Sequence, residues 1–164
     1  FTGGKYSVYE GGTRTPFITW WPGKIKPAVS EEMVCTIDLA ASLASMVGVD
    51  LPSDGILDSF DVHGALLGES GAKGRDHLVQ QDNGKGGNYG LRVGKWKLQR
   101  HDSGKARNIV VTNKLANTDV ARYRLYDLST DIREENNLAA VHPEVFEQMK
   151  TQLAKIIEDG RSRF

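Results

Sequence analysis

The sequence of 164 residues has one cysteine, Cys35, and no excess charge of either sign, because 21 Lys and Arg balance 21 Asp and Glu. A single cysteine excludes an intramolecular disulfide framework, and the lack of a Cys/His cluster argues against a structural zinc site. Zero net charge provides no overall field to attract nucleic acid or an anionic membrane. No run approaches 18 apolar residues, so no transmembrane helix is predicted. The remaining composition, 39% hydrophobic and 26% charged, is that of a globular protein.

The chain begins at Phe1 without an initiator methionine and without a charged and then apolar leader. We interpret this start as a cut end and expect further sequence upstream. The segment from Gly3 to Pro16 holds four glycines and a proline, which disfavours helix and predicts an irregular loop. Long ordered loops often carry function.

Two elements are expected before a polar break at Glu69–Gly74, in addition to a short helical turn near Val62–Leu67. The β-branched and aromatic run Phe17–Trp21 predicts a largely buried strand, in which tryptophans serve core packing. Apolar residues at helical spacing predict a helix over Thr36–Val47, capped by Thr36 and ending at Gly48. The break divides the chain into subdomains 1–73 and 74–164.

The second subdomain is predicted to hold a small antiparallel sheet of about four strands packed against a long C-terminal helix. Alternating apolar residues and turn chemistry predict the strands, with a type II′ turn at Gly94-Lys95. Pro143 suits the first position of the final helix, whose apolar residues form one stripe. The fold class is therefore α/β, as an α+β fragment. The predicted strands are His77–Gln81, Tyr89–Val93, Trp96–Gln99 and Tyr123–Leu128.

Lys5 is a candidate anion ligand, because it follows two glycines and precedes an aromatic residue in a loop whose backbone can approach a ligand closely, although this local signal is weak by itself. A cation in such a loop is suited to an anion. The alternative, from spacing alone, is a solvated lysine beside a local ion pair of Glu10 and Arg14. The four histidines are scattered along the sequence and suggest no ligand set.

The motif Gly-Gly-Lys-x-x-x-Tyr-Glu-Gly-Gly-x-Arg-x-Pro, from Gly3 to Pro16, resembles that of the formylglycine-dependent sulfatases. The likeness continues through Trp21-Pro22-Gly23-Lys24-Ile25 and nearly the whole chain. The chain is similar to the C-terminal third of enzymes of the arylsulfatase A or N-acetylgalactosamine-6-sulfatase type, within the alkaline-phosphatase-like superfamily. Further matching segments are Thr36–Leu39, Leu91–Leu98, Leu125–Leu128 and Glu135–Ala139.

This resemblance implies that Lys5 contacts the sulfate group of the substrate, while Glu10 and Arg14 shape the loop behind it. The family also implies calcium and a formylglycine, made from Cys or Ser in a Cys/Ser-x-Pro-x-Arg motif, in the full-length parent. Neither is identifiable here, so no metal site is expected in this chain. Cys35 lacks the following Pro and Arg and is predicted to be a buried core thiol. The Asp82-Asn83-Gly84 sequence is interpreted as a turn.

The parent is thus expected to hydrolyse sulfate monoesters, most naturally of a sulfated carbohydrate, outside the cytoplasm, and this chain alone is expected to be inactive. Two alternatives stay open: a phosphonate or phosphate monoester hydrolase of the same superfamily, and a non-catalytic module that binds sulfated glycans. The expected partner is the missing N-terminal sulfatase domain. Without it, the apolar surfaces of residues 1–50 are expected to promote self-association.

Overall fold

The computed structural model describes residues 1–52, 54–82, 87–102, 104–106 and 118–163. The chain divides into two compact units, and each combines separated parts of the sequence. One unit contains Phe1–Pro16 and Val79–Lys155, and the other contains Phe17–Leu78 and Ile156–Phe164. The predicted boundary between residues 73 and 74 is a division along the sequence, and it stays a prediction.

A four-stranded sheet forms the centre of the first unit, with the strand order β1-β2-β3-β6. Strand β3 pairs antiparallel with β2 on one side and with β6 on the other. Gly94, at the turn between β2 and β3, has a φ of 55°, the positive value that the first central position of a type II′ turn requires. The predicted sheet is confirmed. The strands are β1 (His77–Gln81), β2 (Tyr89–Val93), β3 (Trp96–Arg100) and β6 (Tyr123–Asp127).

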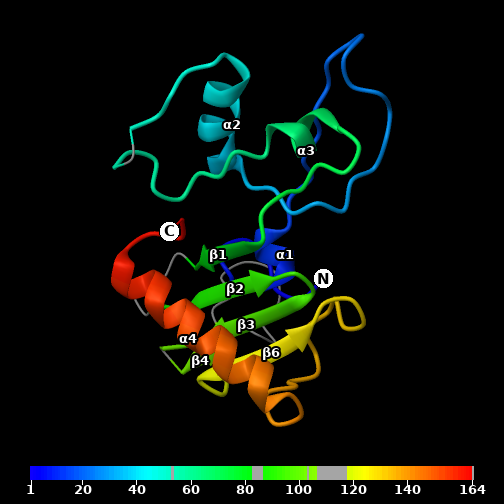
Figure 1. Cartoon of the computed structure of the whole chain (residues 1–164). Helices are drawn as coiled ribbons and strands as arrows, with labels where there is room; N and C mark the ends of the chain where they lie inside the picture. The colour runs from blue at the N-terminus through cyan, green and yellow to red at the C-terminus, as the bar shows by residue number, and fades with distance from the viewer. Residues whose placement is uncertain (53, 83–86, 103, 107–117, 164) are drawn as a thin grey trace. The chain divides into compact units, whose positions relative to one another are not determined.

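One face of this sheet is apolar and is covered by helix α4 (Pro143–Asp159), which lies in front of the sheet in Figure 1. Leu91, Leu98 and Leu125 stand directly opposite one another on three neighbouring strands, and all three have 0% exposure. Full burial of one such side chain contributes about 2 kcal/mol. The predicted long C-terminal helix, beginning at Pro143, is confirmed.

The other face of the sheet is polar, although it is equally buried. Lys97, Gln99 and Tyr126 alternate with the leucines along β3 and β6, and each has 0% exposure. The N-terminal segment lies behind the sheet in Figure 1 and contains the short helix α1 (Glu10–Thr13). The expectation of a wholly irregular loop was therefore wrong for one helical turn.

The second unit contains the short helices expected from the sequence, but their caps differ. A 3-10 turn, η1 (Thr36–Asp38), precedes α2 (Leu39–Met46), and α3 spans His63–Leu67. The predicted Thr36 cap is absent. The buried Asp38 carboxylate instead accepts a hydrogen bond from the Cys35 backbone N–H at 2.9 Å.

Buried Arg75 joins the parts of this second unit. Its guanidinium donates to the Asp38 carboxylate at 2.6 Å, to the Asp58 carbonyl at 3.1 Å and to the His77 carbonyl at 2.9 Å. An arginine whose donors meet a charged partner and backbone carbonyls avoids much of the cost of burial. The sequence did not indicate this role for Arg75.

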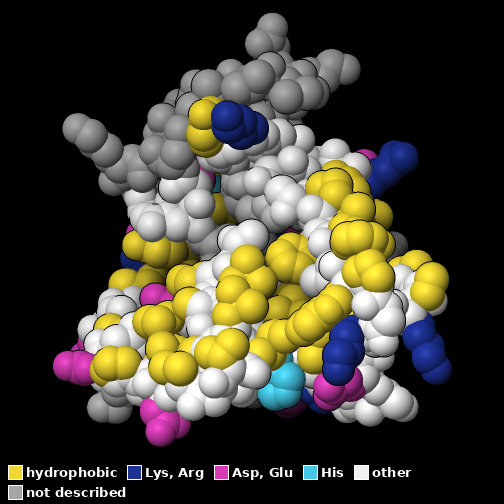
Figure 2. Space-filling model, turned by 90° about the horizontal axis from the view of Figure 1, so that it is seen from above, with side chains coloured by type: hydrophobic (Ala, Val, Ile, Leu, Met, Phe, Trp, Pro, Cys, Tyr) yellow, Lys and Arg dark blue, Asp and Glu magenta, His cyan; other side chains and the backbone are white. Residues whose placement is uncertain are grey.

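The prediction of a buried strand at Phe17–Trp21 was wrong. These residues belong to no strand, and the exposed fractions of Ile18 and Trp20 are 87% and 83%. A strand needs a neighbour for its backbone hydrogen bonds, and the described residues offer this segment no pairing partner. Trp20 and Trp21 are therefore not core residues here. Figure 2 shows hydrophobic side chains spread over the face seen from above.

The single cysteine, Cys35, lies in the second unit. Cys35 is half-buried, so its prediction as a buried core thiol was wrong. Its side chain lies at the start of η1, where the chain has not yet entered the helix.

A short pair of strands, β4 (Lys105–Ala106) and β5 (Thr118–Asp119), was not predicted. No helix among the described residues has the length and apolar character needed to cross a membrane.

Candidate functional site

Lys5 lies on a tight turn in the N-terminal loop. The Ser7 backbone N–H donates to the Gly4 carbonyl at 3.1 Å, and the Ser7 hydroxyl donates to the same oxygen at 2.8 Å. Tyr6 has a φ of 75°, which is the left-handed value that the third position of a type II turn requires. The turn therefore fixes the backbone on both sides of Lys5.

Helix α1 packs against this turn so closely that glycine is required. A Cβ atom on Gly12 would lie 2.4 Å from the Ser7 carbonyl oxygen and 2.5 Å from the Gly4 carbonyl oxygen. A Cβ on Gly11 would lie 2.5 Å from the Gly3 oxygen. The Gly-Gly pair of the motif thus allows α1 to contact the turn that carries Lys5.

The Lys5 side chain is exposed. Its ammonium lies 4.7 Å from the centre of the Tyr6 ring, a cation–π distance. Lys5 forms no ion pair with another described residue, whereas Lys95 and Lys97 each have a carboxylate partner. The Glu10–Arg14 ion pair of the alternative interpretation exists, at 2.9 Å. An exposed Lys5 without a carboxylate partner is common to that interpretation and to a role in anion binding.

The hydrogen bonds and ion pairs of Glu10 and Arg14 do not include Lys5. Glu10 begins α1 and is 2% exposed, and its carboxylate accepts hydrogen bonds from Arg14 at 2.9 Å and Lys97 at 2.8 Å. Arg14 is the outer member of this group, with its side chain 39% exposed. The placement is that of residues that support the loop, and their role in function stays a prediction.

Two residues that sequence reasoning missed complete this buried group. Glu134 accepts the Glu10 backbone N–H at 2.7 Å, and its other oxygen lies 3.1 Å from the Lys97 ammonium. The same oxygen accepts a hydrogen bond from the Gln99 amide at 2.7 Å. Lys97 therefore bridges two carboxylates under the N-terminal loop. The alternating pattern of β3 marks Lys97 as a polar position, and nothing in that pattern shows that the face is covered.

The pKa values of the Glu10 and Glu134 carboxyl groups shift in opposite directions. Burial acts to raise the pKa of Glu10, but the charge and hydrogen bond of Lys97, together with Arg14, hold that pKa below its ordinary value. Burial dominates at Glu134 and raises its pKa, although Lys97 and the Glu10 N–H act against the rise. Glu10 therefore has two cationic partners, Lys97 and Arg14, whereas Lys97 is the cation beside Glu134.

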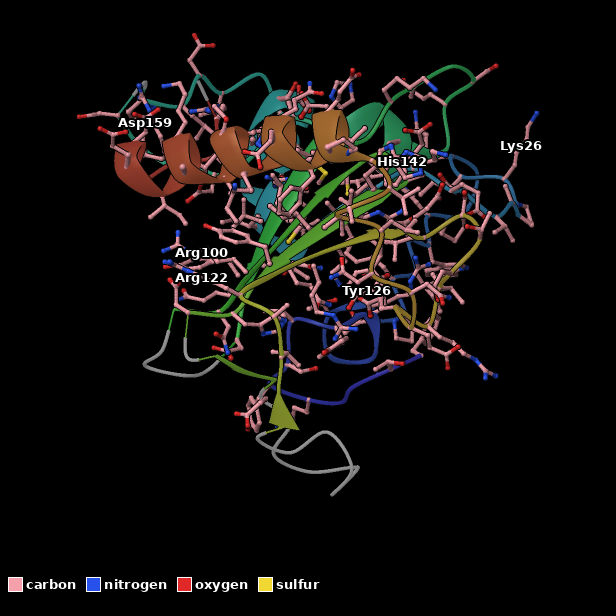
Figure 3. The ribbon with its side chains drawn as sticks, turned by 90° about the horizontal axis from the view of Figure 1, so that it is seen from below. Lys26, Arg100, Arg122, Tyr126, His142 and Asp159 are labelled. Carbon is pink, nitrogen blue, oxygen red and sulfur yellow. The ribbon has the colours of Figure 1, made fainter. Side chains whose placement is uncertain are left out.

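A second buried contact joins the loop to the sheet beside this group. Tyr9 is 1% exposed, and its hydroxyl accepts a hydrogen bond from Arg124 of β6 at 3.0 Å. The guanidinium of Arg124 also lies 5.1 Å from the centre of the Tyr126 ring. Tyr126 is labelled in Figure 3, which views the molecule from below. Burial raises the pKa of the Tyr9 phenol and that of the Tyr126 phenol.

The described residues do not fit a calcium site or a formylglycine. They bring together no group of three His, Cys, Asp or Glu side chains suited to a metal. Cys35 precedes Thr36-Ile37-Asp38 and not the Pro and Arg of the family motif. Asp82 is buried and accepts a hydrogen bond from Asn88 at 2.8 Å. Asn83 and Gly84 of the predicted turn lie outside the described residues.

The first unit is therefore a mixed α/β fold, with a helix on one face of an antiparallel sheet and an exposed, unpaired lysine held over the other. The sulfatase family model matches residues 1–49. The chain is 36% identical over 163 residues to the N-acetylgalactosamine-6-O-sulfatase of Bacteroides thetaiotaomicron, covering 99% of this chain and 30% of that protein. It is 34% identical over 174 residues to human arylsulfatase A, covering 98% of this chain and 34% of the relative.

A comparison with solved structures finds the same kind of relative. A solved structure from work on the metabolism of multiple glycosaminoglycans by Bacteroides thetaiotaomicron has a TM-score of 0.79 and 35% identity, and the match covers 94% of this chain and 31% of that one. The chain belongs to the sulfatase family and corresponds to the C-terminal part of its relatives. It spans about a third of the length of the curated relatives named here. The resemblance and the fold class inferred from the sequence are confirmed.

Proposed function

We propose that this chain is the C-terminal part of a sulfatase that hydrolyses sulfate monoesters, and that Lys5 contacts the sulfate group. The observation that carries the proposal is the state of Lys5 itself. Its ammonium is exposed and has no carboxylate partner among the described residues, although the turn that carries it is fixed by hydrogen bonds and close glycine packing. An unpaired cation carried by a fixed backbone turn is suited to an oxyanion.

The chemical role of Lys5 follows from the charge of the substrate. A sulfate monoester carries one negative charge, and cleavage of its S–O bond moves negative charge onto oxygen atoms. An ammonium that donates a hydrogen bond to a sulfuryl oxygen stabilises the bound ester and the transition state. The part of this stabilisation that increases toward the transition state accelerates the reaction.

The proposed substrate class is a sulfated carbohydrate. The relatives named above support it, since one is an N-acetylgalactosamine-6-O-sulfatase. Calcium and formylglycine, expected from the family, belong by this proposal to a part of the protein outside the chain described here. Function outside the cytoplasm is part of the same proposal, and cell fractionation of the producing organism tests it.

The proposed partner is the rest of the sulfatase domain. Supporting this, the family match extends over residues 1–49, and several apolar side chains in that range are exposed. Covering them would remove apolar area from water. By this proposal the chain alone releases no sulfate. The most exposed of these side chains are Phe1, Ile18, Trp20, Val29, Val47 and Val49.

Replacement of Lys5 by alanine in the full-length protein tests the proposal. We expect kcat on 4-nitrophenyl sulfate to fall about 10²-fold or more, by analogy with the loss of other electrostatic stabilisers. Lys26→Ala is the matched control, because Lys26 is also an exposed lysine on a loop, in the other unit. Its kcat should equal that of the unmodified protein.

The same assay separates the alternatives. If the full-length protein cleaves 4-nitrophenyl phosphate faster than the sulfate ester, the assignment to the phosphate or phosphonate monoester hydrolases replaces ours. If it cleaves neither ester but retains sulfated glycans on a column, it is a binding module. Equal kcat for Lys5→Ala and Lys26→Ala would refute the role of Lys5.

A further inference from the structure

The group beneath the N-terminal loop is unusual because all of its inner charges are buried. The side chains of Lys97 and Glu134 are 0% exposed, and that of Glu10 is 2% exposed. Buried charges are costly to desolvate, and an apolar cluster of similar volume generally gives equal or greater stability. Stability alone is therefore a weak reason for this arrangement.

The buried group binds the first residue of α1, Glu10. Glu134 uses one carboxylate oxygen for the Glu10 backbone N–H, at 2.7 Å, while Lys97 binds the Glu10 side chain at 2.8 Å. Both the backbone and the side chain of Glu10 are thus fixed. Glu134 also has a φ of 57°, a left-handed value that is uncommon for a residue with a side chain. The sheet unit holds this carboxylate in place despite the strain.

Glu10 in turn connects to the turn that carries Lys5. The residue after it, Gly11, donates its backbone N–H to the Thr2 carbonyl at 2.8 Å, three residues before Lys5. Gly12 packs directly on the carbonyl oxygens of Gly4 and Ser7, the two ends of the turn. A shift of Glu10 would therefore move the segments on both sides of Lys5.

We propose that Lys97 and Glu134 are positioning residues for Lys5. They hold Glu10, and through it the loop, at the place where the Lys5 ammonium meets a sulfate oxygen, and they themselves touch no substrate. This inference rests on the proposed function of Lys5. Lys97, on β3, and Glu134, before α4, lie 87 and 124 residues from Glu10 in the sequence. By this proposal, both residues support a loop near Phe1 that takes part in the reaction.

A double-substitution experiment in the full-length protein tests this inference. The main variant is Lys97→Met with Glu134→Gln, which removes one charge of each sign and leaves the Glu10–Arg14 pair. We measure kcat and KM on 4-nitrophenyl sulfate and inhibition by inorganic sulfate, both in the unmodified background and together with Lys5→Ala. Thermal unfolding shows that each variant is folded. Lys95→Met is the control, because Lys95 also pairs with a carboxylate near β3 but is 53% exposed.

We expect the main variant to lower kcat/KM about tenfold or more, since a displacement of about 1 Å can cost up to 10²-fold in rate. Sulfate inhibition should weaken in parallel. In the Lys5→Ala background the same two changes should have almost no further effect. A purely structural role would instead lower activity by the same factor in both backgrounds, and that result would overturn the inference.

Each remaining outcome also decides between the proposals. If Lys5→Ala retains full activity, the proposed function fails, whatever the main variant does. If Lys5→Ala is impaired but the main variant matches Lys95→Met, the positioning role fails while the function of Lys5 stands. Should the main variant not fold, Glu134→Gln alone, which keeps the shape and one acceptor oxygen, replaces it in the same comparison, with a smaller loss expected in the unmodified background.

Discussion

Gly12→Ala gives opposite predictions from local propensity and from tertiary packing. Gly12 lies within α1, where alanine is favoured over glycine by about 0.5–1 kcal/mol. In the structure, however, the new Cβ would lie 2.4 Å from the Ser7 carbonyl oxygen, 2.5 Å from the Gly4 oxygen and 2.6 Å from the Ser7 hydroxyl. Two of these atoms are backbone, so they cannot rotate away.

The size of the effect follows from these distances. Ordinary contacts of a Cβ atom begin at 3.4 Å, so the turn must move by about 1 Å to admit the methyl group, at a typical cost of about 1–3 kcal/mol for overpacking. After the gain in helix propensity, a net loss of up to about 2.5 kcal/mol remains. The displaced segment is the one that carries Lys5, so kcat on 4-nitrophenyl sulfate should fall by up to about 10²-fold.

The assay compares Gly12→Ala with Gly55→Ala in the full-length protein. A Cβ on Gly55 would find its nearest atom at 3.5 Å, which is ordinary contact, and Gly55 has no positive φ. Amide hydrogen exchange over residues 2–14 should accelerate in Gly12→Ala and stay unchanged in Gly55→Ala. If both variants show the same exchange and the same kcat, the loop is not packed as described, and the argument from its geometry is refuted.

Two further predictions concern pH and association. The lowered pKa of Glu10 means that its ionisation stabilises the fold above the ordinary value of 4.5, and this stability is lost as the pH falls through the lowered pKa. The raised pKa of Glu134 has the opposite sign, so its ionisation opposes folding above 4.5. Glu10→Gln should therefore reduce the free energy of unfolding at pH 7 more than Glu134→Gln does, in urea titrations from about pH 4 to pH 7; equal losses at every pH would contradict this. The isolated 164-residue chain should self-associate through exposed apolar residues, and Ile18→Ser with Trp20→Ser should shift it toward monomer in sedimentation. Monomeric sedimentation of the unmodified chain would contradict that prediction.

Several elements could be predicted because their causes are local. Strands β2 and β3 alternate apolar and polar residues around Gly94, and the end of α2 is marked by Gly48, whose φ is 68°. Helix α4 has Pro143 at its start and a stripe that buries Met149 and Leu153. In each case the signal and the structure it specifies lie within a few residues of each other.

The errors share another cause, which is dependence on groups outside the local sequence. Phe17–Trp21 has the composition of a buried strand, yet a strand forms only where another strand pairs with it. Two of the four residues of helix α1 are glycine. The helix forms because the Glu134 carboxylate accepts the first backbone N–H of α1 and because the glycines permit close packing. Neither condition can be read from the segment itself.

The sequence by itself determined the local elements of the sheet unit and the family, since the spacing of the Gly-Gly-Lys motif and of its glycines is a property of the chain alone. It also singled out Lys5 as a cation in a loop. The tertiary structure decided which charges became buried. Lys97 occupies a position that would face water in an isolated hairpin, and it is enclosed because the N-terminal loop covers that face of the sheet. Burial depends on which distant segment covers a side chain, and local sequence carries no record of that segment.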